Sequence, residues 1–113
     1  LFRSSVLVDE YLLAGSKKMR TQGPPTVAWC AEQFHLTPSY FGDIVRREMG
    51  ITPQAFLHNK LIERSKSLLA SKELTINDIA EELGFSYPNH FARLFRQKTG
   101  MSPRAFRKQL LNE

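Results

Sequence analysis

The sequence IAEELGFSYPNHFARLFRQKTGMSPRAF, residues 79–106, repeats the pattern of an earlier stretch, CAEQFHLTPSYFGDIVRREMGITPQAF, residues 30–56. Towards the end of each copy, identical residues recur at a spacing of 50: Phe41 and Phe91, Arg46 and Arg96, Gly50 and Gly100, Pro53 and Pro103. Towards the start the spacing is 49, as between Ala31 and Ala80. The second copy therefore gains one residue between LTPSYF and FSYPNHF, and we expect it in a turn or at a helix start, where insertions are tolerated.

Each copy carries the start and stop signals of short helices. Thr75 with Asp78 three residues later is typical of a capped helix start, and Thr26 precedes the first copy in the same way. Thr-Pro at 37–38, Thr-Pro at 52–53 and Ser-Pro at 102–103 each place a capping residue before a proline at the first helical position. Gly50 and Gly100 are typical C-terminal stops. No segment alternates apolar and polar residues as a strand does.

These signals predict an all-α fold of about seven helices. We expect two helix-turn-helix subdomains, residues 26–52 and 72–113, the second with a C-terminal helix, joined by a long linker helix over 53–71. Residues 1–25 are predicted to form a helix, VLVDEYLLA, and a polar loop that lead in from a longer protein. His35 stands where the second copy has the turn residue Gly84, so the first turn is expected to be strained or reshaped.

The composition allows one domain or two very small ones. Of the 113 residues, 42% are apolar and the net charge is +5, with a sequence pI of about 9.7. Such a balance favours a polyanionic partner such as nucleic acid, although a solvated basic surface has the same composition. No apolar run approaches the roughly 20 residues of a membrane span. Cys30 is the single cysteine, which fits a reducing cytoplasm.

The second helix of each copy has one apolar and one polar face. In the second copy, at about 100° per residue, Phe91 and Phe95 lie on one side of this helix. The opposite side carries Asn89, Arg93 and Arg96, beside Ala92 and Gln97; in the first copy it carries Ser39, Asp43 and Arg46, beside Gly42 and Arg47. Arg can pair bidentately with guanine, Asn with adenine, and Asp can accept from the cytosine amino group. A solvated face is the ordinary alternative, but the repetition and the lack of acids over 87–98 favour base recognition.

Gly42 and the length of the middle helix both bear on how the chain could fit DNA. Glycine inside a helix costs about 1 kcal/mol relative to alanine, so Gly42 either gives the backbone close access to a ligand or is neutral. A middle helix of about 18 residues would be about 27 Å long, against about 34 Å between successive major grooves on one face of DNA. The connector could therefore place both second helices in adjacent grooves.

Residues 26–110 resemble the AraC/XylS type of bacterial transcription regulators. The second copy follows the family signature: I-A, L-G-F, the F-x-R-x-F core, G-x-S-P and an aromatic–Arg pair. The first copy with NKLIERSKSLL resembles the family's first unit and linker helix. The resemblance implies sequence-specific binding of double-stranded promoter DNA in the cytoplasm, RNA polymerase as a partner, and effector or dimer contacts in a region outside this chain. It implies no enzyme activity, cofactor or metal.

The resemblance also assigns site residues by position. Base contacts are expected from Ser39, Gly42, Asp43 and Arg46 in the first unit and from Asn89, His90, Ala92, Arg93 and Arg96 in the second. Phosphate contacts are expected from Thr37, Arg47, Ser86 and Lys98. An acid at Asp43 repels phosphate, so the first unit should bind more weakly or select cytosine.

Two other classes of function remain as alternatives. A helical protein-interaction module, which grips a polymerase subunit without reading bases, would show a large exposed apolar patch. A cysteine-dependent repair enzyme would use Cys30, but the sequence places no base or cation beside it, and a small core residue is the simpler interpretation. His35, His58 and His90 lack the spacing of metal ligands.

Overall fold

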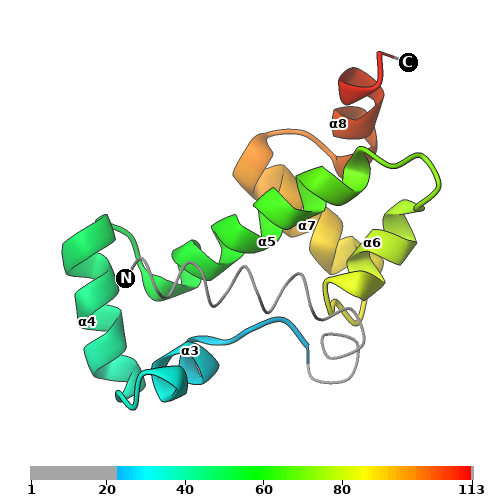
Figure 1. Cartoon of the computed structure of the whole chain (residues 1–113). Coiled ribbons are helices and arrows are strands. Elements are labelled where there is room, and N and C mark those ends of the chain that lie inside the picture. The colour runs from blue at the N-terminus through cyan, green and yellow to red at the C-terminus, as the bar shows by residue number, and fades with distance from the viewer. Residues whose placement is uncertain (1–22, 113) are drawn as a thin grey trace.

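The computed structural model describes residues 23–112, and these residues form helices without strands. The six helices are α3 (Val27–Gln33), α4 (Pro38–Met49), α5 (Pro53–Leu69), α6 (Ile76–Glu82), α7 (Pro88–Thr99) and α8 (Pro103–Leu110) (Figure 1). The all-α prediction is confirmed. The additional helix expected from VLVDEYLLA lies outside the described residues.

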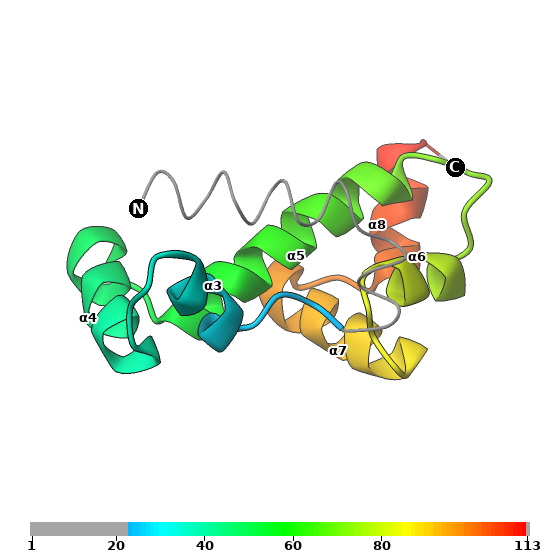
Figure 2. The ribbon, with the colours of Figure 1, turned by 60° about the horizontal axis from the view of Figure 1, so that its bottom comes forward.

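Helix α5 connects the two units and packs against both. It contacts α3 and α4 of the first helix-turn-helix unit, and α6 and α7 of the second, while α8 packs on α7. Figures 1 and 2 show α4 near the start of α5 and α7 along its later turns. The linker helix ends at Leu69, slightly before the predicted residue 71, and a short connection leads to α6.

The helix boundaries follow the predicted capping residues. The side chains of Thr26, Thr37, Thr52 and Ser102 each accept a hydrogen bond from the backbone N–H three residues later. Thr75 and Asp78 form a reciprocal capping box. Gly50 and Gly100 end α4 and α7 with left-handed φ angles of 71° and 80°, which glycine adopts without steric cost.

The added residue of the second copy lies in its turn, as predicted. The turn between α3 and α4 covers residues 34–37, whereas the turn between α6 and α7 covers residues 83–87. One consequence is that Thr37 and Ser86, both expected to contact phosphate, take different positions relative to the helix that follows. Thr37 caps α4, but the N-cap of α7 is Tyr87, whose side chain makes no capping hydrogen bond.

The first turn contains a strained residue at the predicted position. His35 has a φ of 56°, in the same left-handed region as Gly84 at 86°. A residue with a Cβ atom pays about 1–2 kcal/mol in this region, and glycine avoids that cost. The chain therefore carries local strain in the turn that precedes α4.

Replacement of His35 by glycine is expected to stabilise the protein. The relief of strain exceeds the added flexibility of the unfolded chain, for a net gain of about 0.5–1 kcal/mol. Urea denaturation followed by circular dichroism measures the change. Gly84→Ala is the matched control and should destabilise by about 1 kcal/mol. A His35→Gly protein no more stable than the parent would contradict the assignment of strain.

The core is one cluster in which the predicted apolar stripes of α4 and α7 are buried. Phe41 and Val45 of α4, and Phe91 and Phe95 of α7, are at most 1% exposed. In the second unit the aromatic rings form a continuous row. Ring centroids lie 5.6 Å apart for Phe85–Phe91, 5.8 Å for Phe91–Phe95 and 5.4 Å for Phe95–Phe106. This packing fixes the orientation of α7, because its buried face is held by rings from the preceding turn and from α8.

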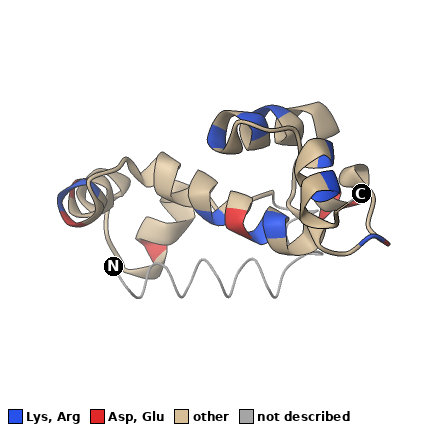
Figure 3. Ribbon diagram, turned by 90° about the horizontal axis from the view of Figure 1, so that it is seen from above, with Lys and Arg blue, Asp and Glu red and all other residues tan. Residues whose placement is uncertain are grey.

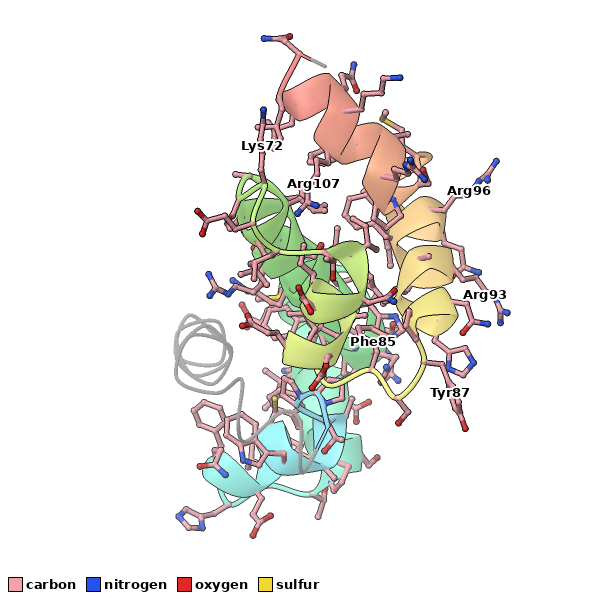
Figure 4. The ribbon with its side chains drawn as sticks, turned by 90° about the vertical axis from the view of Figure 1, so that its right-hand side faces the viewer. Lys72, Phe85, Tyr87, Arg93, Arg96 and Arg107 are labelled. Carbon is pink, nitrogen blue, oxygen red and sulfur yellow. The ribbon has the colours of Figure 1, made fainter. Side chains whose placement is uncertain are left out.

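Arg107 of α8 ties the end of the linker helix to the second unit. Its Nε donates to the carbonyl of Leu69 at 3.0 Å and its Nη2 donates to the carbonyl of Ser71 at 2.9 Å, and Figure 4 shows the side chain directed towards the end of α5. The last carbonyls of a helix lack partners within the helix. The guanidinium satisfies one of them, that of Leu69, together with the carbonyl of Ser71 in the following connection, and it places a positive charge at the negative end of the helix dipole.

Arg107→Ala, which removes the guanidinium, is expected to destabilise the protein by about 1.5–3 kcal/mol, the range for hydrogen bonds to a charged group. Arg107→Lys should recover only part of this, because an ammonium group lacks the planar fork that reaches both carbonyls. Arg104→Ala removes an exposed arginine from the same helix and serves as the control in thermal denaturation. Wild-type stability in Arg107→Lys would show that charge alone matters.

Candidate nucleic-acid interface

The exposed face of α7 presents polar and basic side chains together. Asn89, His90, Arg93 and Arg96 are exposed, whereas Ala92 is half-buried. Figure 4 shows Arg93 and Arg96 extending from the same side of α7, away from the body of the protein. Because Phe91 and Phe95 are held in the core, this face cannot turn inward. The helix carries no acidic residue, so every formal charge on its exposed side is positive.

The corresponding face of α4 has a mixed charge. Ser39, Asp43, Arg46 and Arg47 are exposed. The Arg46 Nη1 lies 3.4 Å from the Asp43 Oδ1, so the two predicted base-contacting side chains pair with each other. An exposed pair of this kind contributes about 0–1 kcal/mol, and Arg46 can leave it at little cost. Figure 3 shows the contrast between α4, with both charge signs, and α7, with basic residues alone.

Gly42 corrects one expectation about the α4 face. We predicted it at the edge of the exposed surface, but the residue is buried. A Cβ atom at this position would lie 3.3 Å from the Cγ of Pro53 and 3.2 Å from the Nη1 of Arg46. The absence of a side chain therefore lets the start of α5 and the Arg46 side chain pack over α4. This packing explains the glycine better than either access for a ligand or neutrality.

The predicted phosphate-contacting residues are all on the surface. Thr37, Arg47, Ser86 and Lys98 are exposed, and the Thr37 hydroxyl also accepts from the N–H of Tyr40. Lys98 lies near His58 of α5. Burial lowers the pKa of His58, and the positive charge of Lys98 lowers it further. Lys98 thus sits where the second unit meets the linker helix.

Three exposed residues near these faces were not predicted. Tyr87 and Tyr40 are 60% and 52% exposed, at or near the starts of α7 and α4. Gln54 lines a shallow hollow together with Ser39, Gly42 and Arg46, and its Nε2 lies 2.8 Å from the Nε2 of His58. Position alone could have drawn attention to the tyrosines, because the first residues of a recognition helix reach furthest into a groove.

The features expected of an enzyme or metal site do not come together in the described part of the chain. Cys30 is 2% exposed, and burial raises the pKa of its thiol to about 11. At neutral pH the thiol is therefore protonated and shielded, as expected of a small core residue. Within residues 23–112, no group of three or more His, Cys, Asp or Glu side chains could hold a metal. No described helix is both long and apolar enough to cross a membrane.

The family model described as a helix-turn-helix domain matches residues 30–109, which covers both units and the linker helix. The chain belongs to the AraC/XylS family. It is 37% identical over 78 residues to the HTH-type transcriptional activator RhaS of Escherichia coli O139:H28, a match that covers 69% of this chain and 28% of RhaS. The match thus spans 28% of the length of that relative, less than a third.

Two solved structures share the fold of this AraC/XylS domain. A transcriptional regulator with an AraC-type DNA-binding domain from Chromobacterium violaceum superposes with a TM-score of 0.70 at 20% identity, over 93% of each chain. The DNA-binding domain of the global transcriptional factor AdpA, solved in complex with a target DNA, gives a TM-score of 0.70 at 22% identity, over 90% of each chain. At these identities the likeness concerns the fold.

Proposed function

We propose that this AraC/XylS domain binds specific sequences of double-stranded DNA, with α4 and α7 as recognition helices in adjacent major grooves. The observation that carries the proposal is the face of α7. It presents Asn89, Arg93 and Arg96 to solvent without an acid among them. Arg and Asn are the side chains that pair bidentately with guanine and adenine.

The linker helix supports the use of two grooves. The 17 residues of α5 correspond to about 26 Å of helix, and successive major grooves on one face lie about 34 Å apart. Contacts of α5 with α3, α4, α6 and α7 hold both units on one support. One chain would then occupy two grooves, as helix-turn-helix dimers do with two chains.

The two units are proposed to contribute unequally. In α7 the basic side chains meet no acid on their own helix, whereas in α4 Arg46 is paired with Asp43. Phosphate attraction should therefore be stronger at the second unit. The Asp43 carboxylate gives the first unit a preference for cytosine, because it can accept from the cytosine amino group.

The regulatory role and the remaining partners are proposed from the family. RhaS is a transcriptional activator, and the AdpA domain was solved with a target DNA. By analogy, we place this domain in a cytoplasmic transcription regulator that contacts RNA polymerase, with effector or dimer contacts made by other parts of the protein. The matched part is 28% of RhaS, so these roles rest on the relative.

A binding experiment tests DNA recognition directly. Duplexes selected from a random pool are titrated with the protein at several salt concentrations, and fluorescence anisotropy reports the dissociation constant. We expect affinity to fall steeply with salt, because each neutralised phosphate releases about 0.9 counterion, and to fall further for a scrambled duplex. Equal affinity for selected and scrambled duplexes would overturn sequence-specific binding.

The protein-interaction alternative receives less support from the surface. The large apolar side chains that the structure describes as exposed are Tyr40 and Met49 on α4, Tyr87 at the start of α7 and Leu110 on α8. They are spread over three helices, whereas an interaction patch gathers apolar side chains in one area. The two tyrosines also lie at the ends of the proposed recognition helices, where a DNA contact accounts for them.

A further inference from the structure

Tyr87, the N-cap of α7, adds an exposed aromatic ring at the N-terminal end of the proposed recognition face. Tyr87, His90, Arg93 and Arg96 follow one another at intervals of three residues, and all four are exposed. Residues three apart are neighbours on a helix surface, but three such steps turn by about 180°, so the shared side of these residues follows from the structure and not from the spacing. Figure 4 shows Tyr87, Arg93 and Arg96 on the same side of the second unit. The face therefore has two halves, an aromatic half at the N-terminal end and a basic half beyond it.

The aromatic half is a defined pair of rings. The ring centroids of Tyr87 and His90 lie 5.1 Å apart, with the rings inclined at 67°, an edge-to-face arrangement that favours contact between aromatic rings. Tyr87 keeps 60% of its surface exposed, and its side chain takes no part in capping α7. The pair thus presents an aromatic surface to solvent at the start of α7.

We propose that the Tyr87–His90 pair recognises the 5-methyl group of a thymine, and thereby sets the base preference at one position of the site bound by the second unit. The inference rests on the proposed function. The N-terminal residues of a recognition helix contact base edges, and the thymine methyl is the apolar group that the major groove presents. Contact with this methyl would bury the tyrosine ring. The basic side chains of Arg93 and Arg96 offer the methyl no comparable apolar surface.

The pair is specific to the second unit. At the position that precedes the helix proline, the first unit has Thr37, whose hydroxyl caps α4. Tyr40 lies at the position that matches His90 by the spacing of 50 residues, but without a second ring from residue 37. Tyr40 therefore offers a control: an exposed tyrosine on the other recognition helix.

The test removes the methyl group alone. Within the duplex obtained by selection, each thymine is replaced in turn by deoxyuridine, which keeps every hydrogen-bonding group. Affinities are measured by anisotropy for the wild-type protein and for Tyr87→Ala, Tyr87→Phe and Tyr40→Ala. For the wild type we expect one deoxyuridine, in the part of the duplex that the second unit protects from cleavage, to weaken binding about fourfold, the effect of burying one methyl group.

The variants assign that effect to the ring. Tyr87→Ala should bind the thymine and deoxyuridine duplexes equally, whereas Tyr87→Phe and Tyr40→Ala should keep the fourfold difference. The inference is overturned if no deoxyuridine substitution weakens binding by the wild type more than binding by Tyr87→Ala. It is also overturned if the selected duplexes have no thymine in the part that the second unit protects. An equal loss in Tyr87→Phe and Tyr87→Ala on every duplex would instead identify a phosphate contact by the hydroxyl. In all these cases, specific binding by the wild type leaves the proposed function intact.

Discussion

Replacement of Arg93 by alanine is expected to weaken binding to the selected duplex by about 1–3 kcal/mol, a loss of about five- to 150-fold in affinity. It should also relax the base preference at one position of the duplex. Arg93 is exposed in the middle of the recognition face, between the aromatic half and Arg96. Its helix is anchored by the buried rings of Phe91 and Phe95, so removal of the guanidinium should leave the fold unchanged. Anisotropy titrations of the selected and scrambled duplexes measure both effects.

The control for Arg93→Ala is Arg104→Ala, which removes the same charge from an exposed site on α8. Any change in Arg104→Ala should be equal for the two duplexes, because loss of a phosphate contact does not depend on sequence. If Arg93→Ala also lost affinity equally on both duplexes, Arg93 would be a phosphate contact and would not read a base.

Arg93 is a better probe of base recognition than Arg46. Arg46 occupies the α4 face but lies 3.4 Å from the Asp43 carboxylate. Its removal frees that carboxylate near the DNA as well as deleting a cation, and the two effects cannot be separated in one variant. Arg93 has no acidic neighbour on its own helix, so its deletion reports one interaction.

The helices and their order could be predicted from the sequence because the information is local. Thr26, Thr52 and Ser102 mark helix starts through hydrogen bonds that span three residues, and Gly50 and Gly100 mark helix ends through their own φ angles. The repeat then allowed the two units to be predicted from these local signals, since similar sequences are expected to fold in the same way. The change of spacing likewise placed the added residue in a turn.

Other features depend on contacts between elements and could not be predicted in this way. Gly42 is explained by the approach of Pro53, which belongs to the next helix. Arg107 bonds carbonyls 36 and 38 residues earlier in the chain. The Arg46–Asp43 pair lies within one helix, but its formation depends on the rotamers of two flexible side chains, which the sequence does not fix. Helical periodicity places residues on faces, but it does not show which of them are covered or paired.

Truncation of Phe95 to alanine is expected to cost about 3–5 kcal/mol, the range for a buried aromatic residue. Phe95 is fully buried, and its ring contacts Phe91 on one side and Phe106 on the other. Proteins of this size have about 5–15 kcal/mol of stability, so this single change removes a large part of it. Leu110→Ala, at a position that is 46% exposed, is the control and should change stability by about 0.5 kcal/mol or less.

The same variant shows whether the two units unfold together. The single tryptophan, Trp29, lies on α3, so its fluorescence reports the first unit, while circular dichroism reports all helices. Because the buried residues of both units and of α5 form one cluster, we expect urea denaturation of Phe95→Ala to shift both signals to the same lower midpoint. A shift in circular dichroism with an unchanged Trp29 transition would mean that α5 links two independent folding units. Coincident transitions would mean that α5 transmits the loss of packing around Phe95 to the first unit, so that the two units unfold as one.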